Sequence, residues 1–363
     1  MRSPNSSPDS RWTRRAFATL PAMAAAQTID GEIRRMAEAP PLAMRFTGST
    51  TAEFTNWRGA FQAKLGELLG PIDPPARWDM VEESRSEREG VRRLSLVLRA
   101  GGVRDLPVHL LEPSGSGKRA AVLALHGHGK HGYDPVAGIA ETPERRADLD
   151  KANYDYGWQL ARRGYLVAVP CFTPFGRRLG DPAAYKGEDP CGVTFVRMQL
   201  FGQVLMGENL RDALWALELL ALHPRADPAR MACVGLSYGG RMAMLTAAMS
   251  DRIRAAVCSG ALNVMQERVR GRYGCGAQVI PGLLKYGDVP EIGSLIAPRP
   301  CVWEVGQKDG LMVKAWLEPS LERMRRAWKA AGSPDNLQVD SFDGGHRWNG
   351  AAAYPMLERV LGG

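Results

Sequence analysis

Three residues of the kind that break acyl bonds follow separate apolar runs in the second half of the chain. Ser237 lies in VGLSYGG, which fits the pattern G-x-S-x-G between an apolar run and a helical pattern. The turn between two such elements leaves no room for side chains at the flanking positions. It exposes the serine hydroxyl at the amino end of a helix, where the helix dipole and free N–H groups favour an anion. The motif therefore predicts a nucleophile at Ser237.

A serine nucleophile needs a base, and the base needs an acid that orients it. His346 lies in the glycine-flanked loop FDGGHRWN, directly after the last strand pattern. From there its imidazole can take the serine proton and pass it to a leaving group. Asp309 follows the preceding strand pattern, whereas Glu304 lies inside it, so we prefer Asp309 as the acid. The resulting order, Ser237, Asp309, His346, is the order expected when the three residues follow successive strands.

A glycine-rich loop, LHGHGKHG, brings three more histidines together after an earlier apolar run. His126, His128 and His131 are spaced like part of a metal-binding H-x-H-x-D-H pattern, but Lys130 stands at the aspartate position. No later cluster of His or Cys completes a ligand set in the sequence, so we expect no metal ion. The alternative is a loop whose backbone N–H at His128 joins that of Tyr238 in an oxyanion hole. His126 is then a packed structural residue.

The elements that position these residues are predicted by strand patterns that alternate with helical patterns. The strand patterns cover residues 92–100, 106–115, 120–127, 165–170, 230–237, 253–260, 298–306 and 336–344. The first two read as a hairpin and most of the other six are separated by amphipathic helices. This alternation predicts an α/β fold with a mostly parallel eight-stranded sheet flanked by helices. Ligands of such sheets bind at the carboxyl ends of the strands, where the candidate residues lie.

The amino-terminal part of the chain has a different character. Residues 50–70 show helical spacing of apolar side chains and end at a glycine before a proline-rich break. We divide the chain into a tail (1–28), an N-terminal helical extension (29–85) and a catalytic domain (86–363). The tail sequence TRRAF, followed by small apolar residues, resembles a twin-arginine export signal, which predicts a periplasmic or exported protein. A disordered basic arm on a cytoplasmic protein is the alternative.

Composition limits the partners that this chain can have. Its 363 residues, 45% of them hydrophobic, are enough for one large domain or two ordinary ones. No apolar stretch approaches the ~20 residues that span a bilayer, so we expect no membrane insertion. The net charge of +8 comes from scattered basic residues, which argues against a nucleic-acid partner.

The six cysteines form no C-x-x-C pair, which argues against a zinc knuckle or a thioredoxin-like site. Cys233, Cys258 and Cys301 fall in apolar strand patterns, and we expect them to be buried small hydrophobes. Cys191 and Cys275 lie in loop-like segments, so one disulfide between them stays open.

Several motifs together resemble the α/β-hydrolase superfamily: LHGHG, VGLSYGG, VGQKDG and DGGHRW. ALELLALHPRADPARMACVGLSYGG and PGLLKYGDVPEIGSLIAPRP are similar to its dienelactone-hydrolase and acetyl-xylan-esterase-like branch, and the likeness covers about residues 90–363. The resemblance implies a triad of Ser237, His346 and Asp309, oxyanion donors at Tyr238 and His128, and no cofactor. Acetyl-xylan esterases usually carry glutamine where this chain has Tyr238, which also occurs in relatives of prolyl oligopeptidase.

The leading hypothesis is a serine hydrolase that cleaves carboxylic esters, with a small-molecule ester of a short acyl group or an acetylated carbohydrate as substrate. The inserts at 171–203 and 264–293 are expected to roof its pocket, with Arg177, Arg178, Tyr185 and Trp348 as candidate contacts. The alternatives are a prolyl-oligopeptidase-like aminopeptidase or acylaminoacyl-peptidase, and a non-catalytic binding relative. The sequence predicts no oligomeric state.

Overall fold

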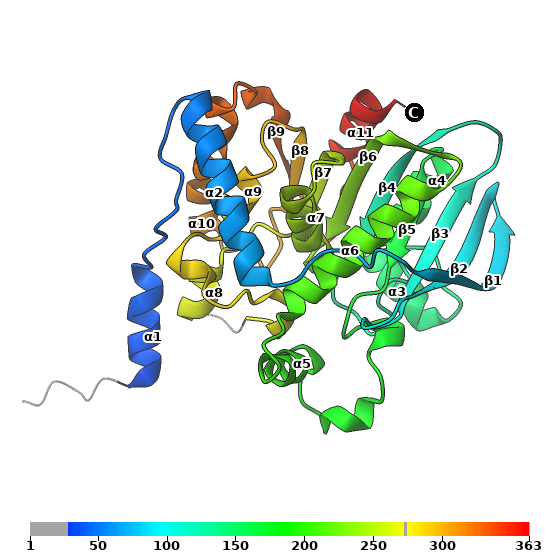
Figure 1. Cartoon of the computed structure of the whole chain (residues 1–363), viewed down its shortest axis with the longest axis horizontal. Helices are drawn as coiled ribbons and strands as arrows, with labels where there is room; N and C mark the ends of the chain where they lie inside the picture. Colours follow the sequence, from blue (N-terminus) through cyan, green and yellow to red (C-terminus); the bar gives the residue numbers. More distant parts are fainter. Residues whose placement is uncertain (1–27, 272–273, 363) are drawn as a thin grey trace, which may run out of the picture.

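The structure, a computed structural model, describes residues 28–271 and 274–362. Within these residues the centre of the molecule is a nine-stranded sheet with the order β1-β2-β3-β5-β4-β6-β7-β8-β9 (Figure 1). The strands are β1 (Asp79–Arg88), β2 (Val91–Arg99), β3 (Leu106–Pro113), β4 (Arg119–Leu125), β5 (Leu166–Pro170), β6 (Ala226–Leu236), β7 (Ile253–Ser259), β8 (Cys301–Gly306) and β9 (Leu337–Phe342). All neighbours from β5 to β9 pair in parallel, and β1, β2 and β3 join by antiparallel pairing. The predicted α/β class and mostly parallel sheet are confirmed.

The sheet has one strand more than the eight predicted, because β1 adds an outer edge. Every residue of β1 is exposed, and its sequence DMVEESRSER lacks the apolar alternation that predicts a strand. Its ladder with β2 is what makes it a strand, and charged residues on such an edge discourage pairing with another chain. The boundary expected at residue 86 therefore falls inside β1.

Helices fill the connections between the strands. They are α1 (Ile29–Glu38), α2 (Thr51–Leu69), α3 (Pro143–Ala152), α4 (Tyr156–Arg162), α5 (Pro190–Gln199), α6 (Leu205–Leu222), α7 (Tyr238–Met249), α8 (Met265–Gly271), α9 (Val289–Ser294), α10 (Lys314–Ala330) and α11 (Ala353–Leu361). Helix α2 confirms the helix predicted over residues 50–70. It begins with a capping box between Thr50 and Glu53, and it packs against the helical layer through buried Phe54, Phe61 and Leu65.

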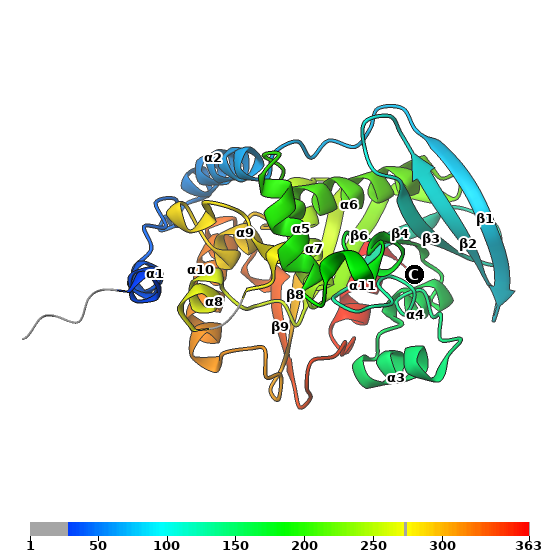
Figure 2. The same ribbon diagram turned by 90° about the horizontal axis from the view of Figure 1, so that it is seen from below.

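Side chains alternate between the two faces of the sheet, and each face has its own helical layer. In β4, Leu123 and Leu125 belong to one buried cluster, whereas Val122 and Ala124 belong to the other. Figure 2 shows α2 and α6 along one side of the sheet and α4 and α11 on the other. Burial on both faces explains why the central strands read as continuous apolar runs.

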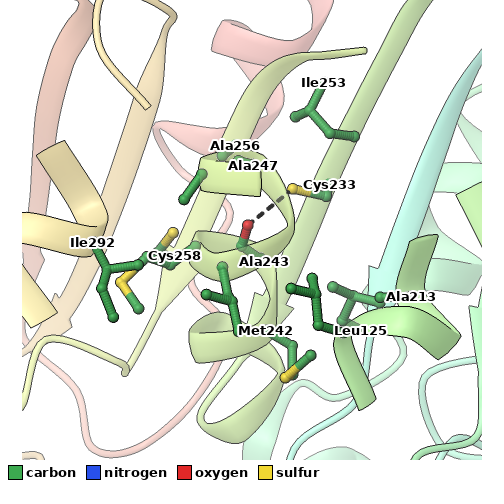
Figure 3. Close-up of a cluster of buried hydrophobic side chains, with 14 of the residues drawn as sticks. Leu125, Ala213, Cys233, Met242, Ala243, Ala247, Ile253, Ala256, Cys258 and Ile292 are labelled. Carbon is green, nitrogen blue, oxygen red and sulfur yellow. Dashed lines mark hydrogen bonds between the residues drawn. The ribbon is translucent and has the colours of Figure 1, made fainter. Parts of the chain in front are cut away.

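Small side chains bring α7 close to the strands behind it. Figure 3 shows Ala243 and Ala247 of α7 beside Cys233 of β6, whose Sγ donates a hydrogen bond to the Ala243 carbonyl at 3.2 Å. As predicted, Cys233, Cys258 and Cys301 are fully buried. The strand β6, the helix α7 and the turn between them therefore form one tightly supported unit.

Two predictions concern the ends of the chain and its relation to membranes. The export signal expected in residues 1–28 lies outside the described residues, apart from Thr28, which caps α1. Across residues 28–271 and 274–362, no helix combines the length and apolar character that crossing a membrane requires.

Candidate active site

Ser237 occupies the sharp turn between β6 and α7. Its backbone has φ 64° and ψ −122°, a conformation that L-residues rarely adopt and that is concentrated at functional sites. The Ser237 N–H donates to the carbonyl of Ser259 in β7 at 2.8 Å, which holds the strained turn against the next strand. The turn places Ser237 at the wall of a cavity of about 500 Å³ at the carboxyl edge of the sheet.

The glycines around Ser237 are required by close backbone contacts. A Cβ at Gly239 would lie 1.8 Å from the carbonyl oxygen of Leu125, and one at Gly235 would lie 2.2 Å from the carbonyl of Gly239. Neither contact can be relieved by rotating a side chain, because backbone atoms stand on both sides. These glycines therefore let α7 start directly over the end of β4.

His346 and Asp309 form a hydrogen-bonded pair beside this turn. The His346 Nδ1–H donates to Asp309 Oδ2 at 2.7 Å, and the other oxygen, Oδ1, accepts from the Leu311 N–H at 2.8 Å. The Asp309 side chain is 1% exposed and that of His346 is 27% exposed, so the acid is buried and the imidazole is partly exposed. A Cβ at Gly260 would lie 2.8 Å from the imidazole, which shows how closely the ring rests on β7's end.

The outer nitrogen of His346 is the reactive end of this pair. Because Nδ1 carries the proton that Asp309 accepts, Nε2 holds the lone pair. Nε2 is buried and has no hydrogen-bond partner among the described residues. Ser237 and His346 line the same cavity, and catalytic hydrogen bonds often tighten only when a substrate binds. His346 therefore has an acceptor nitrogen that no described residue uses, and it shares its cavity with Ser237.

Glu304, which we set aside as the partner of His346, contacts the backbone that follows His346 and not its ring. It is buried in β8, and its carboxylate accepts from the N–H groups of Asn349 at 3.1 Å and Gly350 at 2.6 Å. Burial raises the pKa of Glu304. It holds the end of the loop that carries His346, so it positions that loop while Asp309 contacts the ring.

Tyr238 is the first residue of α7, and its side chain points to the interior. Its N–H belongs to the first turn of α7, where helix geometry offers no intrahelical acceptor. Its ring is fully buried, and its hydroxyl accepts a hydrogen bond from Asn209 Nδ2 of α6 at 2.6 Å. Burial raises the pKa of Tyr238 far above its usual value, so the phenol stays neutral. The side chain anchors α7 in the interior, which leaves the backbone N–H as the candidate oxyanion donor.

The glycine-rich loop after β4 packs directly on the serine turn. A Cβ at Gly127 would lie 3.0 Å from that of Ser237, and the Gly127 N–H donates to the hydroxyl of Tyr154 at 2.6 Å. That donor is therefore already used, and His128, which lines the cavity, is the next one along the loop. Sequence reasoning missed Tyr154, because nothing in its local pattern shows that it reaches this loop.

His126 is buried with both ring nitrogens in use, as the sequence predicted for a packed residue. Its Nε2 accepts from the Phe172 N–H at 2.9 Å, so Nδ1 carries the proton that it donates to the Gly127 carbonyl at 2.8 Å. Burial lowers the pKa of His126 to about 4. The ring joins β4's loop to the chain after β5 and takes no part in the cavity.

We expect the burial of His126 to make the protein acid-sensitive in a defined window. In the unfolded chain a histidine titrates near pH 6.5, whereas folded His126 stays neutral to about pH 4. Between these values the unfolded state binds more protons, so the free energy of unfolding falls as the pH falls, by about 3 kcal/mol in total from this group. Denaturant unfolding of the wild type and His126→Gln at pH 7 and pH 4.5 should show a smaller loss in the variant. A folded-state NMR titration in which His126 protonates near pH 6.5 would contradict this.

The residues that line the cavity differ in part from the two inserts that were predicted to cover it. Residues of the second insert line it as expected, including Met265, Arg268 and Gln278, but no described residue of the first insert does. Its other wall includes residues between 131 and 154, which lie outside both predicted inserts.

None of the four candidate contacts is among the residues that line the cavity. Arg177 pairs with Glu83, Arg178 with buried Asp212, and the Tyr185 hydroxyl with the Leu179 carbonyl, while Trp348 is fully buried and donates to the Tyr354 hydroxyl.

The structure also corrects the expectation that no cysteine cluster accompanies the histidine loop. His128 Nε2 lies 2.9 Å from Cys275 Sγ, and Cys191 joins them from α5. The two cysteines are free thiols that lie next to each other. They are 84 positions apart in the sequence, so only the packing of the two inserts brings them together.

Comparisons with known proteins agree with this architecture. No protein-family model matches the chain. It is 31% identical over 295 residues to the protein named "Putative hydrolase YtaP" of Bacillus subtilis (strain 168), covering 80% of this chain and 94% of that protein. A structure described as a "putative acetyl xylan esterase" from Bacteroides fragilis NCTC 9343 is 20% identical, with a TM-score of 0.73, and covers 86% of this chain and 81% of its own. A glucuronoyl esterase from Solibacter usitatus is 13% identical, with a TM-score of 0.61, and covers 88% and 98%.

The two solved structures show the shared fold, and the similarity to YtaP extends along most of both chains. The chain therefore has the α/β-hydrolase fold, belongs to the same family as YtaP and is a hydrolase.

Proposed function

We propose that this hydrolase is a serine esterase that cleaves small carboxylic esters, with acetylated carbohydrates as the substrate class. The observation that carries the proposal is the meeting of Ser237, the His346–Asp309 pair and the start of α7 at one cavity. The solved structures with this fold include an esterase of acetyl xylan and one of glucuronoyl esters, by their names.

The proposed reaction begins when Ser237 Oγ attacks the ester carbonyl carbon and His346 Nε2 takes the hydroxyl proton. The carbonyl π electrons move to the oxygen, and the N–H groups of Tyr238 and His128 hold that oxyanion. As the tetrahedral intermediate collapses, the bond to the alcohol breaks and His346 gives its proton to the departing oxygen. A water molecule then attacks the acyl-Ser237 ester by the same steps and releases the acid. Asp309 keeps the imidazole in one tautomer and stabilises its positive charge.

The lining of the cavity supports a polar alcohol group. Asp148, Lys151, Asn263, Arg268 and Gln278 lie around it, with Leu236 and Leu311 as apolar contacts. Hydroxyl groups of a sugar match such a mixture of donors and acceptors. A long acyl chain would instead need a continuous apolar channel.

The experiment compares esters with an amide of similar size. We expect hydrolysis of p-nitrophenyl acetate and of an acetylated xylose, and none of alanine p-nitroanilide under the same conditions. Cleavage of the anilide without cleavage of the esters would favour an aminopeptidase. A folded protein that cleaves none of the three would favour a binding relative.

A further inference from the structure

The side chains of His128, Cys191 and Cys275 form a cluster at the cavity wall, and the proposed esterase reaction uses none of these three side chains. The His128 and Cys275 side chains line the cavity, and Cys191 is buried behind them in the first turn of α5. The imidazole nitrogen and the two sulfur atoms lie within 4.8 Å of one another. Three segments that are far apart in sequence therefore place three metal-binding atoms together.

The backbone is built to hold these segments close. A Cβ at Gly276 would lie 2.6 Å from the carbonyl oxygen of Cys191, so glycine is required for α5 to approach the chain next to Cys275. The His128 ring is fixed from two sides, with centroid distances of 5.2 Å to Phe175 and 5.3 Å to Tyr238. These contacts orient the imidazole toward the sulfur atoms.

The donor set indicates which class of ion would fit. One imidazole and two thiols suit borderline and soft cations such as Zn²⁺, which binds sulfur at about 2.3 Å and nitrogen at about 2.0 Å. A metal ion binds cysteine as the thiolate, so each thiol loses its proton when the ion binds.

In the sequence, the positive charge of Lys130 at the aspartate position argued against a metal ion at this loop. In the structure this charge has a carboxylate partner. The Lys130 ammonium forms an ion pair with the carboxylate of Glu144, and both side chains are more than half exposed. Its charge is therefore paired with a carboxylate at the surface.

We propose that His128, Cys191 and Cys275 bind a thiophilic divalent ion of the Zn²⁺ class, with a fourth coordination position open to the cavity. A bound ion would join the glycine-rich loop, α5 and the chain at Cys275 around the cavity. The proposal does not depend on ester hydrolysis, because metal binding is read directly.

The test is a cobalt titration of the reduced, chelator-treated full chain. One equivalent of Co²⁺ should give the visible bands of a tetrahedral site and a thiolate-to-cobalt charge-transfer band, and Zn²⁺ should abolish both. Cys191→Ser and Cys275→Ser should each weaken Zn²⁺ binding by more than about 100-fold, since losing even an outer partner of a ligand weakens binding 10–100-fold. Cys301→Ala, which removes a buried cysteine of β8, is the matched control and should bind normally.

Three outcomes would overturn the metal site: no cobalt band in the folded, reduced wild type, binding without the charge-transfer band, or unchanged binding in Cys275→Ser. A Cys191–Cys275 disulfide in the isolated protein that gives no cobalt band after reduction would assign the pair to redox chemistry instead. Hydrolysis of p-nitrophenyl acetate by Cys191→Ser, measured in parallel, separates failure of this proposal from failure of the proposed esterase. If Cys191→Ser does not fold, the half-exposed Cys275→Ser carries the test.

Discussion

Ser237→Ala is expected to lower kcat for p-nitrophenyl acetate by about 10⁶-fold, since removing the nucleophile of a triad disables the other two residues as well. The variant loses the oxygen that would form the acyl bond, while Asp309 and His346 keep their hydrogen bond. Steady-state kinetics with wild type and variant measure the ratio. A variant that keeps most of the activity would contradict the assignment.

Two controls separate chemistry from folding. Ser250→Ala makes the same change at the other end of α7, about 20 Å along the helix axis, and should leave kcat unchanged. Ser237→Gly should be as inactive as Ser237→Ala but at least as stable as the wild type. The reason is that glycine adopts a positive φ without the strain that serine has at 64°. A loss of activity in Ser250→Ala would point to a general weakness of α7.

Asp309→Asn is expected to lower kcat by about 10⁴-fold with little change in the fold. A triad whose histidine is held in the wrong tautomer loses about that much of its kcat. Oδ1 of the carboxylate is committed to the Leu311 N–H, so the amide oxygen of asparagine should take that position. The amide NH₂ then faces His346 Nδ1 and donates to it. The proton moves to Nε2, which can no longer accept the hydroxyl proton of Ser237.

The comparison variants for Asp309 are two nearby acids. Asp343→Asn changes an exposed carboxylate that pairs with Lys308 on the same loop edge, and it should keep full activity. Glu304→Gln should lower the stability of the His346 loop, with a smaller effect on kcat. Full activity in Asp309→Asn together with the 10⁴-fold loss in Glu304→Gln would reassign the acid.

The sequence predicted the parts of the fold that depend on local pattern. Strands buried on both faces appear as apolar runs, and the glycines at 235 and 239 mark a turn whose close contacts exclude any Cβ. It also placed Asp309 and His346 after successive strands, and in the structure they form a hydrogen bond. Exposed β1 escaped prediction because its strand character comes from pairing with β2 and from no property of its own residues.

What the sequence could not provide is the packing of irregular segments. Tyr154 reaches Gly127, and Cys191 reaches Cys275, only because inserts fold over the sheet edge. No periodicity reports such contacts, since each is made by one residue of a loop. For the same reason Arg178 read as a candidate substrate contact, although its guanidinium is buried against Asp212.

Ser237 is expected to form the covalent bond to the acyl group, and a fluorophosphonate probe can trap the nucleophile that does so. We expect one adduct per chain in intact-protein mass spectra, mapped by peptide sequencing to Ser237 and missing from Ser237→Ala. An active wild type whose adduct maps to another residue, or that hydrolyses esters without any adduct, would show that Ser237 is not the nucleophile.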